Sequence, residues 1–140
     1  MINLIKLCVG VSTVEELLEH REYYRSRGLG RPDGLNSHRT RMMPKRRDEI
    51  VGKGSLYWVM GGAIRCRQLI VDLEAGTDAE GRSCCHILMD PEIVNTVPQP
   101  KRPFQGWRYL TSDDAPADLD PGASADAAEL TQELAKLGLI

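Results

Sequence analysis

Glycine and proline clusters divide this chain into short segments, which leaves room for many strands and for few long helices. Gly52-Lys53-Gly54 and Gly61-Gly62 bracket residues 55–60, a continuous and largely apolar run of strand length. Turn residues on both sides of such a run are typical of a strand that is buried in a sheet. We therefore predict a buried strand at residues 55–60.

The next part of the chain has the pattern of a β-hairpin. Residues 63–74 predict a long strand, and residues 82–89 predict its return partner. Residues 76–81 between them are polar and begin and end with glycine, which is typical of a hairpin turn. Asp90-Pro91 then ends the pairing, because proline lacks the backbone N–H that a ladder needs.

One helix is expected near the start of the chain, after a first strand at residues 2–9. Ser12 with Glu15 and Thr13 with Glu16 both have the capping-box spacing, and Gly28 provides a stop signal. One face of this helix is predicted to carry Val14, Leu17, Leu18 and Tyr24, with Arg21, Arg25 and Arg27 facing outward.

The rest of the chain predicts a less regular structure. Pro98, Pro100 and Pro103 indicate an irregular approach to a closing strand at residues 104–110. Residues 1–111 are expected to form a single basic domain, and residues 112–140 an acidic linker and a docking helix capped by Ser124. The predicted fold class is α+β, with a small, bent, mostly antiparallel sheet or pseudo-barrel and one helix near each end.

Size and composition limit the class of protein. A chain of 140 residues can bury about two-thirds of its unfolded surface in one core without a metal or a disulfide. No apolar stretch approaches the roughly 18 residues of a membrane span, so we expect a cytoplasmic protein. The four cysteines form no C-x-x-C pair, so we expect reduced, mostly buried thiols and neither a metal nor a cofactor.

Positive charge is concentrated in residues 38–47, which we call the basic run. It carries five Lys or Arg and no carboxylate, although the formal net charge of the chain is -2. Residues 1–110 hold 17 Lys or Arg against 13 Asp or Glu, whereas residues 111–140 hold one Lys against seven acids. A concentrated positive field attracts phosphate or another anion. The alternative is that both regions are ordinary solvated surfaces.

Two arginine pairs extend this binding hypothesis. Arg39 and Arg41 are two residues apart, as are Arg65 and Arg67, so each pair shares one face of its strand. If the two strands are neighbours, the four guanidinium groups form one surface, which we predict to bind RNA or a nucleotide-like anion. The candidate binding residues are His38, Arg39, Arg41, Lys45, Arg46, Arg65, Arg67, Trp107 and Arg108.

Several of these residues also have structural interpretations. Arg67 could pair with a carboxylate such as Asp72, Glu74 or Asp90. Trp58 and Trp107 are favoured as core residues, because the chain contains a single Phe. A surface position is the default for a lone histidine such as His38.

Two other functions stay open. The chain could be a small hydrolase acting on a modified nucleoside or nucleotide, with a site formed by Thr40, Lys45 and Glu74. In such a site the Lys45 amine would activate water or the Thr40 hydroxyl. A deep polar pocket beside Lys45 would favour this enzyme, and an open basic groove would favour binding alone. The acidic tail could instead dock on another protein, which would make the chain an interaction module.

Four segments carry a resemblance to known sequences: residues 5–10 (IKLCVG), 38–46 (HRTRMMPKR), 54–59 (GSLYWV) and 103–110 (PFQGWRYL). They resemble a family of uncharacterised bacterial proteins, a domain of unknown function, over nearly the whole chain. A weaker similarity is to PUA-like barrels, including the ASCH type, and it implies an RNA- or nucleotide-binding pseudo-barrel. The G-x-K-x-x-E-x-R motif of the ASCH type is absent here, so this resemblance implies no catalytic residue.

Overall fold

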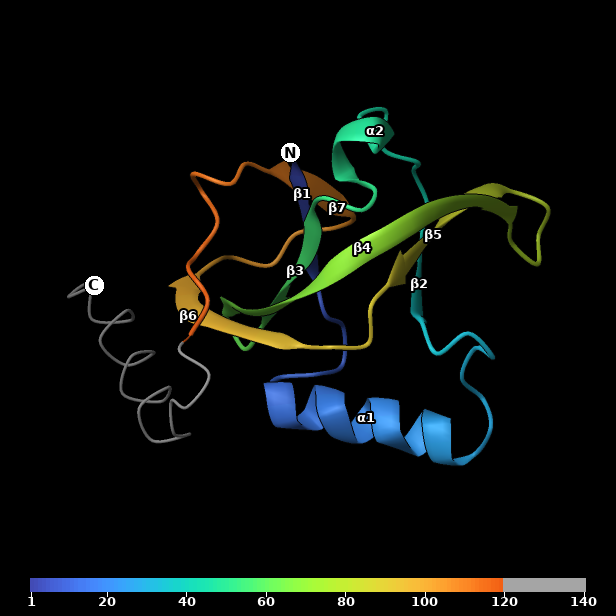
Figure 1. Cartoon of the computed structure of the whole chain (residues 1–140), viewed down its shortest axis with the longest axis horizontal. Helices are drawn as coiled ribbons and strands as arrows, with labels where there is room; N and C mark the ends of the chain where they lie inside the picture. Colours follow the sequence, from blue (N-terminus) through green and yellow to red (C-terminus); the bar gives the residue numbers. More distant parts are fainter. Residues whose placement is uncertain (120–140) are drawn as a thin grey trace.

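The computed structural model describes residues 1–119, of which 42% are in strands and 14% in helices. Figure 1 shows these elements in chain order. The strands and helices are β1 (Asn3–Leu7), α1 (Val14–Ser26), β2 (Asn36–Thr40), α2 (Arg47–Ile50), β3 (Ser55–Met60), β4 (Ala63–Thr77), β5 (Ser83–Met89), β6 (Val94–Pro100) and β7 (Trp107–Leu110). No helix in this part of the chain is long and apolar enough to span a membrane.

All seven strands belong to one open, mixed sheet with the order β2-β5-β4-β3-β1-β7, and β6 pairs with β4 outside this path. The predicted α+β class is wrong, because the sheet dominates and the described helices are two short elements rather than a layer. The sheet is mixed because β1 runs parallel to β3 across a long connection that contains α1, β2 and α2. The helix predicted after Ser124 lies outside the described residues.

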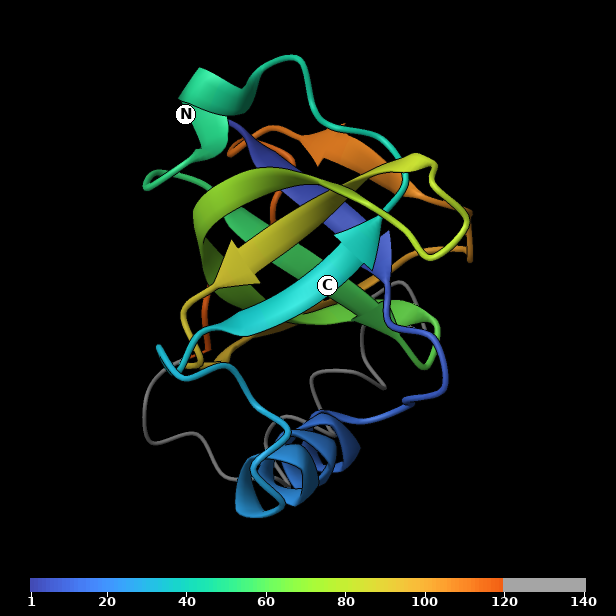
Figure 2. The same ribbon diagram turned by 90° about the vertical axis from the view of Figure 1, so that its right-hand side faces the viewer.

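The long strand β4 bends the sheet. Its first part pairs with β3 and β6, and its second part pairs with β5. All three pairings contain a register shift, and such irregularities increase the local bend and twist of a strand. Figure 2 shows the resulting curvature, with α1 and α2 at opposite ends of the sheet.

Apolar side chains fill both faces of the curved sheet. The larger cluster lies on the inner face and includes Leu4, Trp58, Ile70, Ile87 and Met89. A smaller cluster on the other face is built around Ile5, Val59 and Ile64. The prediction that Trp58 is a core residue is confirmed, since 1% of its surface is exposed. Trp107 is half-buried against the larger cluster.

Several elements match their sequence signals and others differ. β3 has the predicted bounds, and α1 begins after Thr13, whose hydroxyl accepts a hydrogen bond from Glu16 N at 3.1 Å. The irregular segment predicted before the closing strand is instead partly strand β6, which contains Pro98. Among the named strands β6 pairs with β4 alone, and a marginal strand tolerates proline because the missing N–H costs it few ladder bonds.

The start of the acidic tail packs against the sheet. The backbone N–H of Val97 donates to Ala117 O at 2.8 Å, and that of Leu119 donates to Asn95 O at 2.9 Å. Thr96 and Asp118 form an isolated antiparallel bridge. Residues 117–119 are therefore paired with β6, after a turn at residues 112–115, while the linker and the domain boundary after residue 111 stay predictions.

Candidate functional site

The basic run does not form one continuous positive surface. Arg39 lies on the outward face of β2, and Arg41 and Lys45 are exposed in the loop that follows it. Arg46 pairs with Glu49 at 2.6 Å, and Arg47 pairs with Asp72. Two of the five cations of the run are therefore neutralised by neighbouring carboxylates.

Arg65 and Arg67 do not join this surface. β2 pairs with β5, whereas the part of β4 that holds these arginines pairs with β3 and β6. Arg65 donates to the carbonyl groups of Met60 and Gly61 at 2.6 and 2.8 Å. Arg67 pairs with Asp118, so the structural alternative holds for it, although with a carboxylate that the sequence did not suggest. The predicted surface of four guanidinium groups does not form.

The loop after β2 contacts β7, which brings aromatic side chains beside the basic run. Trp107 Nε1 donates to Met42 O at 2.8 Å, and the backbone N–H of Arg46 donates to the hydroxyl of Tyr109 at 3.2 Å. The guanidinium of Arg46 lies 5.5 Å from the centre of the Tyr109 ring. Arg108, also on β7, instead lies over the Phe104 ring at 4.5 Å and is separate from this contact.

The three candidate hydrolytic residues do not converge. Thr40 is buried opposite Cys85 on the inner face, whereas Glu74 is exposed opposite His86 on the outer face. Lys45 is exposed in the loop beyond β2 and does not line the cleft described below. The structure therefore does not gather these side chains around one reacting group.

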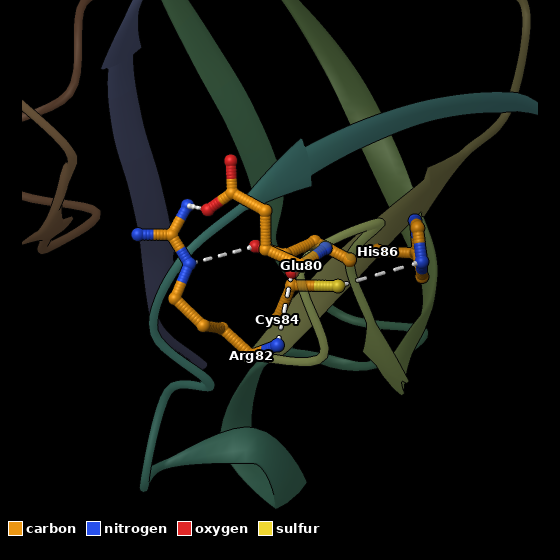
Figure 3. A network of polar contacts seen from close by, with 5 residues as sticks. Glu80, Arg82, Cys84 and His86 are labelled. Carbon is orange, nitrogen blue, oxygen red and sulfur yellow. Dashed lines mark hydrogen bonds and ion pairs between the residues drawn. The ribbon is translucent and has the colours of Figure 1, made fainter.

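Figure 3 shows a polar network at the β4–β5 hairpin. Arg82 pairs with Asp78 at 3.2 Å and with Glu80 at 2.7 Å, so its charge is compensated locally. Cys84 Sγ lies 3.7 Å from His86 Nε2. In the described part of the chain all four cysteines are unbridged, and no group of three or more His, Cys, Asp or Glu has the arrangement of a metal site.

A cleft of about 720 Å³ lies between α1 and the end of the sheet, and we call it the α1 cleft. Its walls are largely apolar and come from α1, from the loop after α1 and from the segment before β6. The apolar wall residues include Leu17, Tyr24, Leu35, Pro91 and Ile93. Tyr24 is 42% exposed, so a ring is accessible at the cleft.

A hydrogen-bonded group joins the α1 cleft to the core. Gln68 is fully buried on β4, and its Oε1 accepts from Trp58 Nε1 at 3.0 Å and from Arg21 Nη2 at 3.3 Å. Gln68 Nε2 donates to Asn36 Oδ1 at 2.8 Å and to Asp90 O at 3.0 Å. Both the oxygen and the nitrogen of the Gln68 amide are therefore hydrogen-bonded, and the oxygen holds the Arg21 guanidinium at the cleft.

His38 reaches the same cleft from the inner face of β2. Its ring meets the Trp58 ring edge to face, with 5.1 Å between the centroids. Burial, followed by the charges of Lys6 and Arg21, lowers the pKa of His38 to about 4, so the ring is neutral at pH 7. Its Nε2 atom is buried and has no hydrogen-bond partner among residues 1–119. His38 is thus a cleft residue and not a surface histidine.

Among the described residues, Arg25 and Arg31 at the cleft pair with Glu22 and Asp33, whereas Arg21 at the cleft and Lys6 near His38 have no such partner. Within the described residues, neither Arg21 nor Lys6 has an Asp or Glu oxygen within 4.0 Å, and burial lowers the pKa of both. The one carboxylate in the lining, Glu22, already pairs with Arg25 at 2.6 Å. Partly buried charges without a partner are costly, so this arrangement favours an anion in the cleft.

The prediction that Arg21 faces outward is wrong. Leu17, Arg21 and Tyr24 are spaced by four and three residues, so they share a helix face that meets the cleft. Gln68 was also missed, although it alternates with the buried residues Cys66 and Ile70 and must therefore point inward. Both signals were present in the sequence, but neither identifies the partner across the cleft.

No curated protein and no solved structure matches this chain. A family model described as a protein of unknown function (DUF1489) matches residues 4–140, which is nearly the whole chain. The chain therefore belongs to the DUF1489 family of proteins of unknown function.

Proposed function

We propose that this chain binds a nucleotide-like anion, and that the α1 cleft receives it. The observation that carries the proposal is the Arg21 guanidinium, which Gln68 holds at the cleft without a carboxylate partner among the described residues. A phosphate or carboxylate would supply the missing charge, and arginine donates two parallel hydrogen bonds to such groups. We thus place the binding site in the α1 cleft and not on the basic surface that the sequence predicts.

The other contacts favour an anion that also carries a planar, weakly polar group. The cleft volume of about 720 Å³ lies within the range of roughly 300 to 1,000 Å³ that is usual for small-molecule sites. Tyr24 offers an exposed ring for stacking, and Leu35 and Ile93 provide apolar contacts.

The test is a calorimetric titration of the full chain with the four nucleoside monophosphates, with adenosine and inorganic phosphate as partial ligands. We expect at least one monophosphate to bind more tightly than either partial ligand. Replacing Arg21→Met keeps an apolar stem in the cleft and removes the charge, so affinity should fall by at least about tenfold. Arg27→Met is the matched control, because Arg27 is exposed at the C-cap, directly after the same helix, and does not line the cleft.

A second measurement does not depend on whether a variant folds. In the unmodified chain, the Trp58 indole N–H reports on the cleft floor by NMR, because it donates to the same Gln68 oxygen as Arg21 does. Its resonance should move on addition of the bound monophosphate. If no monophosphate binds, or if one binds without moving this resonance and with equal affinity for Arg21→Met, the proposal is wrong.

A further inference from the structure

β2 connects the α1 cleft with the basic run. Asn36, Ser37 and His38 line the cleft, and the strand then runs from the α1 end of the sheet toward the α2 end (Figure 1). Side chains alternate along a strand, so Ser37 at the cleft and Arg39 beyond it share the outward face, about 7 Å apart. Arg41 is exposed directly after the strand ends.

The cations along this row have no carboxylate partner in the part of the chain that the structure describes. This holds for Arg39, Arg41 and Lys45, in contrast to the paired Arg46 and Arg47. The acids on the adjoining β4–β5 hairpin are largely engaged elsewhere, since Asp78 pairs with Arg82. Glu80 pairs with the same arginine (Figure 3). Glu74 lies two strands away from Arg39, with His86 between them. The row therefore presents net positive charge from the cleft to the loop.

The row ends beside an aromatic surface. Tyr109 is 37% exposed and Met42 is 66% exposed where the loop after β2 meets β7. The Arg46 guanidinium lies beside the Tyr109 ring. Because Arg46 already pairs with Glu49, little of its charge is left for a ligand. Exposed rings that alternate with free cations are the pattern by which proteins hold single-stranded nucleic acid, with bases stacking at about 1 to 3 kcal/mol each.

From this juxtaposition we infer that the nucleotide in the α1 cleft belongs to a single-stranded nucleic acid, whose backbone follows β2 past Arg39, Arg41 and Lys45 toward Tyr109. The inference rests on the proposed function, because one nucleotide of the strand occupies the cleft. A base in a duplex is stacked and paired. It cannot enter the cleft between α1 and the sheet unless it leaves the duplex. The ligand is therefore unpaired at this nucleotide.

The experiment compares the bound monophosphate with an octanucleotide of the same base, as RNA and as DNA, by competition against a fluorescent octanucleotide. We expect the octanucleotide to bind at least about tenfold more tightly, and its affinity to fall with salt. The combined change R39Q, R41Q and K45Q should reduce octanucleotide affinity by at least tenfold, leave monophosphate affinity unchanged, and lower the salt slope by about 2, at roughly 0.7 per lost contact. The matched control is R27Q, R102Q and K53Q, which removes the same charges from other exposed positions.

The outcomes separate the inference from the proposed function. If the monophosphate binds in the cleft and the octanucleotide binds no more tightly, the inference is wrong and the proposed function stands. If Arg21→Met does not weaken the octanucleotide, or if a duplex binds as well as a single strand, the path through the cleft is also refuted. If no nucleotide of either length binds, both proposals fail. A preference between RNA and DNA supports the path and identifies the sugar that is recognised.

Discussion

Acidification from about pH 7.5 to about pH 4.5 should destabilise the fold through His38, whose ring is held neutral at the α1 cleft. The pKa of His38 is about 4 in the folded chain, against about 6.5 for an unperturbed histidine. Above pH 6.5 the ring is neutral in both states and contributes no pH dependence. Below pH 6.5 His38 binds a proton in the unfolded chain but not in the folded chain, so the free energy of unfolding falls as the pH drops toward 4.

The size of the effect follows from the pKa difference. At about 1.36 kcal/mol per unit, the shift from 6.5 to about 4 corresponds to a loss of at most about 3.4 kcal/mol, of which about 2.5 is expressed by about pH 4.5. His38→Phe keeps a ring against Trp58 and does not titrate, so it serves as the reference. Urea unfolding of both proteins across this pH range measures the difference, because the other titrations are common to both and cancel.

We expect the stability of His38→Phe relative to the unmodified chain to rise by about 2 to 3 kcal/mol on acidification. The physical cause is burial of the ring together with the positive charges of Lys6 and Arg21. Parallel pH profiles for the two proteins would show that the ring is solvated or compensated, and the interpretation of the cleft as a desolvated, positive site would then be wrong.

Three further predictions concern the sheet and its thiols. Gly54→Ala should cost about 1 to 3 kcal/mol in urea unfolding, because its Cβ would overlap the carbonyl oxygen of the residue before β1, whereas Gly30→Ala meets open space and should leave stability nearly unchanged. Asp118→Asn should increase hydrogen exchange at the amide of Leu119, with a cost of at most about 1 kcal/mol, because the lost ion pair to β4 is partly exposed. Burial raises the pKa of Cys66 to about 12, so this thiol should react with a disulfide reagent at about pH 8 only at the rate of unfolding; rapid modification in the native state would contradict its burial.

Local signals in the sequence determined the single elements. Gly52-Lys53-Gly54 and Gly61-Gly62 delimit β3, because turns and apolar runs act over a few residues. Thr13 and Gly28 set the two ends of α1 for the same reason, since capping satisfies backbone groups within one turn. His38 was among the candidate binding residues, but its position at a cleft beside Trp58 could not be read from its neighbours in sequence.

Tertiary structure decided which strands meet and which cations are compensated. The pairing of β2 with β5 separates Arg39 from Arg65 and Arg67, because strand order depends on contacts between residues far apart in the chain. The same long-range packing brings Gln68 to Arg21 across 47 positions. The charge pattern therefore predicted an anion ligand from sequence alone, but the position of the site proposed for it depends on burial and partnering, which exist only in the assembled fold.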